Sequence, residues 1–363
     1  MPVIDLFAGA GGLSIGATDA GCEVRACVEI DTIACKTLRA NESYHGAVVE
    51  ADVAAITGLD LREAARLTPG DPLIVVGGAP CQPFSKAAYW LEDGEESRYR
   101  RARAAGIAME RPLAPLEARP DSRRTLVEEF WRLIFESNAD GFVFENVPSI
   151  KHPRNRPVLD GFQHAAEAAG YQVTQVTANA AEHGVAQARE RVFLLGAKRG
   201  KPAAPQPTHT LKEEPGRKLT MTAGEALEGF DRPEYFEPEE LVTGRWAAHL
   251  RTVPPGWNYK AHTAWAGHPN PTFVTETRFW NFLLKLSPDR PSWTIAASPG
   301  PWTGPFHWTS RRLRTVEMAA LQGFPKGYSL AGSRREKVRQ MGNAVPPPLA
   351  RRMVEAVLAT VDR

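Results

Sequence analysis

Residues 3–16 read VIDLFAGAGGLSIG, and this stretch decides the fold. Val3–Phe7 is a short, mostly apolar run typical of a buried strand, and glycines follow it at positions 9, 11 and 12. Glycine permits a tight turn and a close approach of the backbone to a ligand, although such a turn can also serve only to connect a strand to a helix. The stretch predicts the first unit of an alternating α/β fold.

The same alternation continues through the first 200 residues. Helical patterns separate the apolar runs, for example at 31–41, 123–137 and 158–169. Continuous apolar strands between helices predict a doubly wound, mostly parallel α/β sheet, in which ligands bind beyond the carboxyl ends of the strands. The further runs that we expect to be strands are 24–29, 47–50, 73–76, 141–144, 172–178 and 192–196.

The composition is that of an ordinary globular protein. Of the 363 residues, 43% are hydrophobic and 24% charged, and the net charge of +2 does not by itself indicate nucleic-acid binding. No stretch approaches the about 18 apolar residues of a membrane span, and the chain opens directly on a strand-like run, so we expect a cytoplasmic protein. The four cysteines form no CxxC pair, so neither a disulfide framework nor a metal site is expected.

The pattern changes near Lys198. Residues 201–310 are rich in Pro, Thr and Trp, and seven of the nine tryptophans fall between positions 246 and 308, which indicates a smaller domain packed on aromatic side chains. Helical patterns return at 315–322 and 347–361. We therefore expect a large domain of residues 1–200 plus 335–363, and a second domain with its hinge at 201–334.

Acidic residues follow two successive strands beside the glycine turn. Glu29 ends the second strand and can accept hydrogen bonds from ribose hydroxyls, whereas Asp52 follows the third strand and can meet an adenine amino group. A dinucleotide fingerprint would need a third glycine where the chain has Ser14, which argues against a nicotinamide dehydrogenase. The pattern favours a nucleoside without phosphates, such as S-adenosylmethionine. Glu29 as a merely solvated carboxylate is the alternative.

Reactive side chains follow the next strands. Cys81 lies in GGAPCQPFS (77–85) between Pro80 and Pro83, which restrict the loop and suit a nucleophile that attacks electron-poor carbon. Glu145 ends the strand in FVFENVPSI, where burial would raise its pKa and make it an acid near neutral pH. Arg189 and Arg191 would share one face of an extended segment and could hold a phosphate or a carbonyl oxygen. An inert thiol, a capping glutamate and a surface arginine pair are the alternatives.

Nine blocks in this order make the chain resemble the bacterial C5-cytosine-specific DNA methyltransferases. The resemblance covers residues 3–200 and 311–350 and leaves 201–310 for the variable target-recognition domain of that family. The blocks are DLFAGAGG, VEID, ADV, GGAPCQPFS, DSRRTL, ENV, QARER, RRLRTVEMAALQGFP and RQMGNAVPPPLA.

The resemblance assigns roles to individual residues. It implies that Cys81 adds to C6 of cytosine, that Glu145 engages N3 and the exocyclic amine, that Arg191 holds O2, and that Arg189 supports the site. It implies S-adenosylmethionine as the cofactor and double-stranded DNA, with the target base flipped out, as the substrate. The residues that match cofactor-contacting positions are Phe7, Gly9, Gly11, Gly12, Glu29, Ile30, Asp52, Val53, Pro80, Leu126, Asn343 and Val345.

The long segment 86–121 would close over the DNA, and its arginines would meet phosphates. Residues of the second domain would read bases, mainly from the major groove. By the same resemblance we expect a monomer that is associated with the bacterial nucleoid and acts within a restriction-modification system. A cognate restriction endonuclease is one candidate partner, and an enzyme without such a partner is the alternative. The residues that we expect to contact DNA are Gln82, Ser85, Arg98, Arg100, Arg101, Thr275, Arg278 and Thr294.

Two other functions are compatible with the same fold. The first is a tRNA cytosine-5 methyltransferase, but the Cys-Phe-Thr element typical of that branch is absent from 201–310. The second is a catalytically silent DNA-binding protein, which the presence of Cys81, Glu145, Arg189 and Arg191 disfavours.

Overall fold

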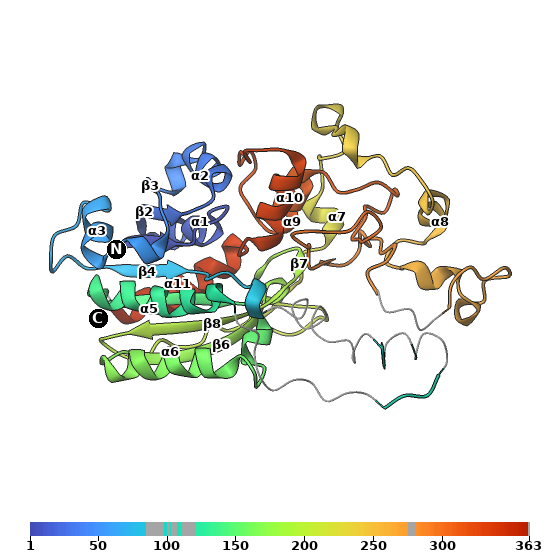
Figure 1. Cartoon of the computed structure of the whole chain (residues 1–363). Helices are drawn as coiled ribbons and strands as arrows, with labels where there is room; N and C mark the ends of the chain where they lie inside the picture. Colours follow the sequence, from blue (N-terminus) through green and yellow to red (C-terminus); the bar gives the residue numbers. More distant parts are fainter. Residues whose placement is uncertain (85–97, 100–101, 103–106, 111–120, 275–279, 362–363) are drawn as a thin grey trace.

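A seven-stranded sheet forms the centre of the large part of the molecule (Figure 1). The computed structural model describes residues 1–84, 98–99, 102, 107–110, 121–274 and 280–361. The strand order is β3-β2-β1-β4-β5-β8-β6; the first five strands are parallel, and β8 is antiparallel to both of its neighbours. The predicted doubly wound, mostly parallel sheet is thus confirmed. Its strands are β1 (Pro2–Leu6), β2 (Glu23–Glu29), β3 (Ala47–Glu50), β4 (Ile74–Gly77), β5 (Gly141–Asn146), β6 (Gln172–Asn179) and β8 (Glu190–Ala197).

Helices cover both faces of the sheet, which explains why its strands are apolar on both sides. Successive residues of β1 point to opposite faces: Val3 belongs to a core that includes Met353 of α11, whereas Ile4 belongs to a core that includes Phe130 of α5. One core contains side chains of α1 (Gly12–Asp19), α2 (Thr32–Arg39) and α11 (Pro347–Val361). The other contains side chains of α3 (Gly58–Ala64), α5 (Leu126–Glu136) and α6 (Arg156–Ala168).

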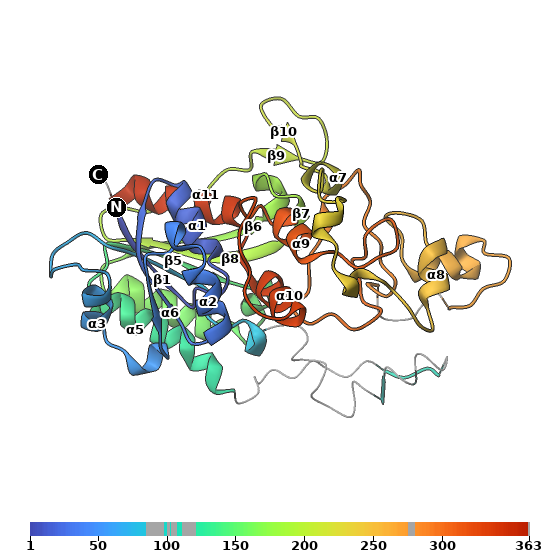
Figure 2. The same ribbon diagram turned by 90° about the horizontal axis from the view of Figure 1, so that it is seen from above.

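The last helix of the chain packs against the first. Figure 2 shows α11 beside α1. A Cβ atom added at Gly12 would lie 2.0 Å from the carbonyl oxygen of Val345, so a side chain at this position would separate the two segments. The third glycine of the opening motif is therefore required by packing between the two ends of the chain.

The segment 201–310 begins along the sheet, where the Pro202 carbonyl oxygen accepts from the Thr174 hydroxyl of β6 at 2.6 Å. Most of its described residues then lie beyond the carboxyl ends of the parallel strands (Figures 1 and 2). A small separate core lies between positions 242 and 306, with Leu250, Tyr259 and Phe306 fully or almost fully buried and Trp246 and Trp302 packed against them. The expected aromatic packing therefore involves some of the tryptophans. Its elements are short: β9 (His209–Thr210), β10 (Lys218–Leu219), α7 (Ala223–Ala226), α8 (Ala247–Thr252) and β11 (Ser292–Trp293), the last pairing with β7 (Gln187–Ala188).

A third core joins the two parts of the molecule. It contains Met318 of α9 (Thr315–Leu321), Val338 of α10 (Arg334–Asn343), and Ala10 and Ile15 from the first βα unit. The sequence RREKVRQMGN has few apolar residues, which explains why α10 carries no clear helical pattern. Within the described ranges, no helix is both long and apolar enough to span a membrane.

Candidate active site

Cys81 is fixed at the carboxyl end of β4. A short 3-10 turn, Gln82–Phe84, follows it directly, and the Phe84 N–H donates to the Cys81 carbonyl oxygen at 3.0 Å. Phe84 is fully buried, and the Arg124 guanidinium lies 5.0 Å from the centre of its ring. The turn is therefore anchored by a core side chain, while the Cys81 side chain is half-buried and Gln82 is exposed.

Glu145 and Arg191 form a buried ion pair next to this turn. The Nε atom of Arg191 lies 2.8 Å from Oε1 of Glu145, and the two side chains are only 11% and 9% exposed. Arg191 also donates from Nη1 to the Glu190 carbonyl oxygen at 2.7 Å. Strand β8 begins at Glu190, two residues earlier than the sequence predicts, so that Arg191 is part of the sheet.

The charges of these groups act on one another. Burial raises the pKa of the Glu145 carboxyl, while the positive charges of Arg191 and Arg189 oppose this increase. Burial also raises the pKa of the Cys81 thiol; a charged Glu145 raises this pKa further, and Arg191 and Arg189 lower it. The four residues that the sequence singles out as catalytic candidates therefore lie close enough to share one electrostatic environment.

Arg189 has a different environment from Arg191. Its side chain is fully buried, and Nη2 donates to the Gly342 carbonyl oxygen at 2.8 Å while Nη1 donates to that of Ile295 at 3.5 Å. Burial lowers the pKa of its guanidinium. Arg189 therefore links the start of β8 to the end of α10 and to the chain that follows β11.

Two further residues, neither of them predicted as a site residue, complete this site. A Cβ atom at Gly78 would lie 2.8 Å from Oε2 of Glu145, so glycine leaves the space that the carboxylate occupies. The Asn146 side chain donates from Nδ2 to the Ala79 carbonyl oxygen at 3.1 Å and holds the end of β5 against the segment that leads to Cys81. The signals were present in the paired glycines before Cys81 and in the Asn that follows Glu145.

The glycine turn after β1 is ordered by Glu29. Oε2 of Glu29 accepts a hydrogen bond from the Gly9 N–H at 2.8 Å, and Oε1 accepts from the N–H groups of Ile30 and Asp31 at 2.9 and 2.8 Å. Phe7 and Gly9 both have positive φ, of 58° and 55°. Glu29 therefore positions the turn itself, and its oxygens keep lone pairs that can accept from ribose hydroxyls.

Other predicted cofactor residues lie near the same edge of the sheet. Asp52 caps a short turn by accepting from the Ala54 N–H at 3.0 Å, and the next residue, Val53, is buried. Gly11 and Gly12 begin α1, where Gly11 faces the ring of His45 and Gly12 the Val345 backbone. The remaining positions are half-buried at Pro80 and Leu126, exposed at Asn343 and buried at Val345.

The residues present fit a nucleoside cofactor. Ile30 is 64% exposed, which leaves a large apolar side chain at the strand edge for an aromatic base. The nearest atom to a Cβ added at Gly9 would be the Phe7 carbonyl oxygen at 3.9 Å, so the turn is open at this point. Among the residues with described positions, no group of three His, Cys, Asp or Glu side chains could hold a metal ion.

The structure locates only some of the predicted DNA contacts. Thr294 is exposed, and its hydroxyl donates to the Ala188 carbonyl oxygen at 2.8 Å, directly before Arg189. Arg98 is exposed in a short helical stretch. The predictions for Ser85, Arg100, Arg101, Thr275 and Arg278 fall outside the described residues.

Residues 1–359 match the model of the C-5 cytosine-specific DNA methylase family. The chain belongs to this family. This methylase is 36% identical to type II methyltransferase M.SacI of Streptomyces achromogenes, over 99% of this chain and 93% of that protein. It is 31% identical to type II methyltransferase M.XorII of Xanthomonas oryzae, over 96% and 82% of the two chains.

Solved structures show the same fold. The Dnmt2 methyltransferase of S. pombe superposes with a TM-score of 0.60 at 13% identity, over 100% of this chain and 99% of that chain. This likeness confirms the predicted fold. The predicted activity of a DNA (cytosine-5-)-methyltransferase is confirmed by the family match and by the 36% identical relative. The C-5 methylase family uses S-adenosylmethionine as its methyl donor.

Proposed function

We propose that this methylase flips a cytosine out of duplex DNA and methylates its C5 with Cys81 as the nucleophile. The observation that carries the proposal is the position of Cys81 at the end of β4, in one electrostatic environment with the buried Glu145–Arg191 pair. A cytosine stacked inside a duplex cannot reach a half-buried thiol, so the base must leave the stack, at a cost of a few kcal/mol.

Activation of Cys81 depends on the proton of Glu145. The thiolate is the reactive form, and burial together with a negative charge on Glu145 raises the pKa of the thiol. Burial also raises the pKa of Glu145. When Glu145 is protonated, its charge no longer opposes the thiolate, and Arg191 and Arg189 favour it. The site therefore combines an acid at Glu145 with a nucleophile at Cys81.

The same pair suits the polar edge of cytosine. A protonated Glu145 can donate to N3, which takes up the negative charge that forms when sulfur adds to C6. Arg191 can donate to the O2 oxygen of the base. Arg189 makes its bonds to Gly342 and Ile295, so we assign it a positioning role.

The cofactor edge lies at the ends of β1, β2 and β3. Bound there, S-adenosylmethionine supplies an electrophilic methyl group. In our proposal Glu29 accepts from the ribose, Ile30 packs against the adenine, and Asp52 accepts from the adenine amino group. Addition of the Cys81 sulfur to C6 makes C5 nucleophilic. After C5 is methylated, loss of its proton and cleavage of the carbon–sulfur bond restore the aromatic ring and release Cys81.

Its relatives suggest a biological role. Those cited above are bacterial proteins named type II methyltransferases. We infer that this chain protects DNA within a restriction-modification system, acting as a monomer in the bacterial cytoplasm beside a cognate endonuclease. Bisulfite sequencing of DNA from cells that express it should show one short, fully methylated sequence context. Methylation scattered over unrelated contexts would contradict this role.

Methyl transfer tests the proposed substrate directly. The protein is incubated with S-adenosylmethionine labelled in its methyl group and with either duplex DNA or tRNA. We expect label in DNA, recovered as 5-methylcytosine after hydrolysis, and none with Cys81→Ala. Label in tRNA alone would support the RNA-modifying alternative and would contradict the proposal.

A further inference from the structure

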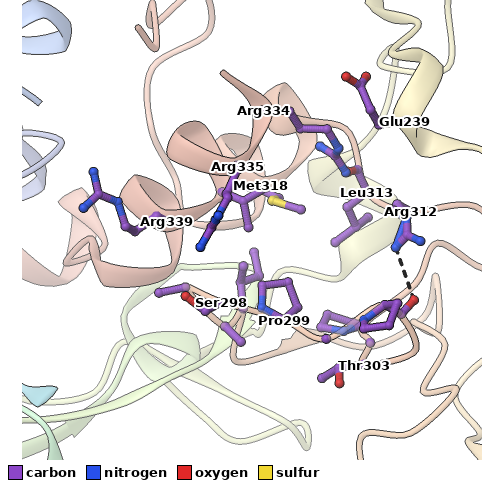
Figure 3. Close-up of a pocket in the computed structure, with 18 of the residues that line it drawn as sticks. Glu239, Ser298, Pro299, Thr303, Arg312, Leu313, Met318, Arg334, Arg335 and Arg339 are labelled. Atoms are coloured by element: carbon purple, nitrogen blue, oxygen red, sulfur yellow. Dashed lines mark hydrogen bonds between the residues drawn. The ribbon is translucent and has the colours of Figure 1, made fainter. Parts of the chain in front are cut away.

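A cavity of about 1070 Å³ lies between α10 and the segment 295–306 (Figure 3). In Figure 3, Arg335 extends from α10 toward Ser298 and Pro299 on the opposite wall, and Arg312 lies at one end of the cavity. None of the catalytic or cofactor positions assigned above lines this cavity.

The lining of this cavity carries an excess of positive charge. Four arginines, at positions 312, 334, 335 and 339, face two glutamates, Glu239 and Glu336. Glu336 accepts from the N–H and the hydroxyl of Ser333 at 2.6 and 2.7 Å, as the cap of α10. One of the two carboxylates on the lining, Glu336, is therefore already bonded to the N-terminus of α10.

Two of the four arginines have no carboxylate partner among the residues that the structure describes. Arg334 pairs with Glu237 at 2.8 Å and Arg339 pairs with Asp31 at 2.6 Å. The Arg312 guanidinium donates to a neutral group, the Pro301 carbonyl oxygen, at 3.3 Å. Arg335 is exposed, and its side chain makes no hydrogen bond or ion pair with any residue whose position is described. The cavity therefore offers two guanidiniums to an anion.

The charged form of the Arg312 guanidinium is disfavoured in this position. Burial lowers the pKa of its guanidinium, and the positive charge of Arg334 lowers it further. An anion in the cavity would relieve both effects, because it replaces lost solvation and screens the neighbouring charge.

The cavity borders the catalytic edge of the molecule. Ile295, part of its lining, accepts the hydrogen bond from Arg189. Ala297, also in the lining, packs closely against Gly342: a Cβ atom added at Gly342 would lie 2.2 Å from the Cα atom of Ala297. At the other end, Arg339 reaches Asp31, next to Ile30. A duplex that delivers a cytosine to Cys81 would therefore run close to this cavity.

We infer that this cavity binds a backbone phosphate of the DNA substrate, with Arg335 as the main contact and Arg312 as the second. The inference rests on the proposed function in taking duplex DNA as the substrate. Phosphate contacts orient a duplex and carry no direct sequence information. The site therefore holds the DNA in place, while base recognition lies elsewhere.

The salt dependence of DNA binding tests this inference. The dissociation constant for a duplex is measured over a range of salt concentrations for the wild type and for Arg335→Gln. The logarithm of the association constant falls as log[salt] rises, and loss of one phosphate contact makes this fall less steep by about 0.9. The wild type should then gain about eightfold in affinity over the variant for each tenfold dilution of salt. The loss should be equal on DNA with and without the target site.

Matched variants separate this effect from general ones. Arg199 is exposed just beyond the last residue of β8, Ala197, which pairs with the first residue of β5 and so lies at the edge of the sheet opposite to the catalytic edge. Arg199→Gln should therefore leave the slope unchanged. Arg335→Lys keeps the charge and should restore most of the slope, whereas Arg312→Gln should reduce it. An unchanged slope in both Arg335→Gln and Arg312→Gln would overturn the inference. It would leave the proposed function intact, because methyl transfer to DNA by the wild type is measured separately.

Discussion

Oε1 of Glu145 lies 2.8 Å from Nε of Arg191, although 45 positions of sequence separate them. The antiparallel direction of β8 creates this pair. Glu145 is the second-last residue of β5, and the register places it opposite Phe193, so the first residues of β8 lie at the carboxyl end of β5. A parallel β8 would put Arg191 at the opposite edge of the sheet. The antiparallel strand β8 therefore places Arg191 at the edge of the sheet where Cys81 and the predicted cofactor residues follow the parallel strands.

Replacing Glu145 tests whether its carboxyl group acts as an acid in the methyl-transfer reaction. Glu145→Gln keeps the shape of the side chain but removes the acid and leaves Arg191 without its counter-charge. We expect kcat at saturating DNA to fall by about 10²- to 10⁴-fold, the usual contribution of a positioned acid or base. Glu63→Gln, at an exposed position of α3, is the control. A kcat close to that of the wild type would exclude Glu145 from proton transfer.

Gly78→Ala tests the space around the same carboxylate. The added methyl group would lie 2.8 Å from Oε2 of Glu145, so the carboxylate must move away from its position beside Arg191. We expect kcat to fall by at least about 10-fold, because small displacements of catalytic groups are costly. Gly161→Ala places the same methyl group on α6 with no atom within 4 Å and should leave kcat unchanged. Equal activity of the two variants would show that the carboxylate position is not critical.

Asp5 should make the stability of the fold depend on pH. Its side chain is fully buried; Oδ2 accepts from the N–H and hydroxyl of Ser14, and Oδ1 has no partner within the described structure. Burial raises its pKa from 3.8 to about 7. Because the folded state holds this proton more tightly than the unfolded state, Asp5 costs stability progressively as pH rises from about 4 to 7.

Asp5→Asn removes this titration. Between pH 5 and pH 8 the wild type should lose on the order of 2–3 kcal/mol of unfolding free energy relative to the variant. Urea unfolding of both proteins at the two pH values measures the difference. If the two proteins lose equal stability over this range, Asp5 does not titrate there.

The sequence predicts which residues lie at the ends of the strands but not the ion pair that two of them form. Strand ends are visible as apolar runs followed by polar residues, so Cys81, Glu145, Glu29 and Asp52 could be placed at one edge. The ion pair to Arg191 depends on the direction of β8, which a local pattern does not encode.

Arg189 shows the same limit. Its two-residue spacing from Arg191 suggests a shared face, but its guanidinium donates to Gly342 and Ile295, more than 100 positions away along the chain. Helix α10 was also not predicted, because it is a charged helix whose few buried side chains pack against distant segments. Contacts of this kind depend on the complete tertiary arrangement.

Trapping the covalent complex tests the central claim most directly. The protein is incubated with S-adenosylmethionine and duplex DNA in which 5-fluorocytosine replaces cytosine. Fluorine at C5 cannot leave as a cation, so the carbon–sulfur bond formed by Cys81 should persist. We predict a protein–DNA adduct stable to denaturation with the wild type and none with Cys81→Ala. No adduct on DNA that the wild type methylates in its unmodified form, or an equal adduct with Cys81→Ala, would contradict the account.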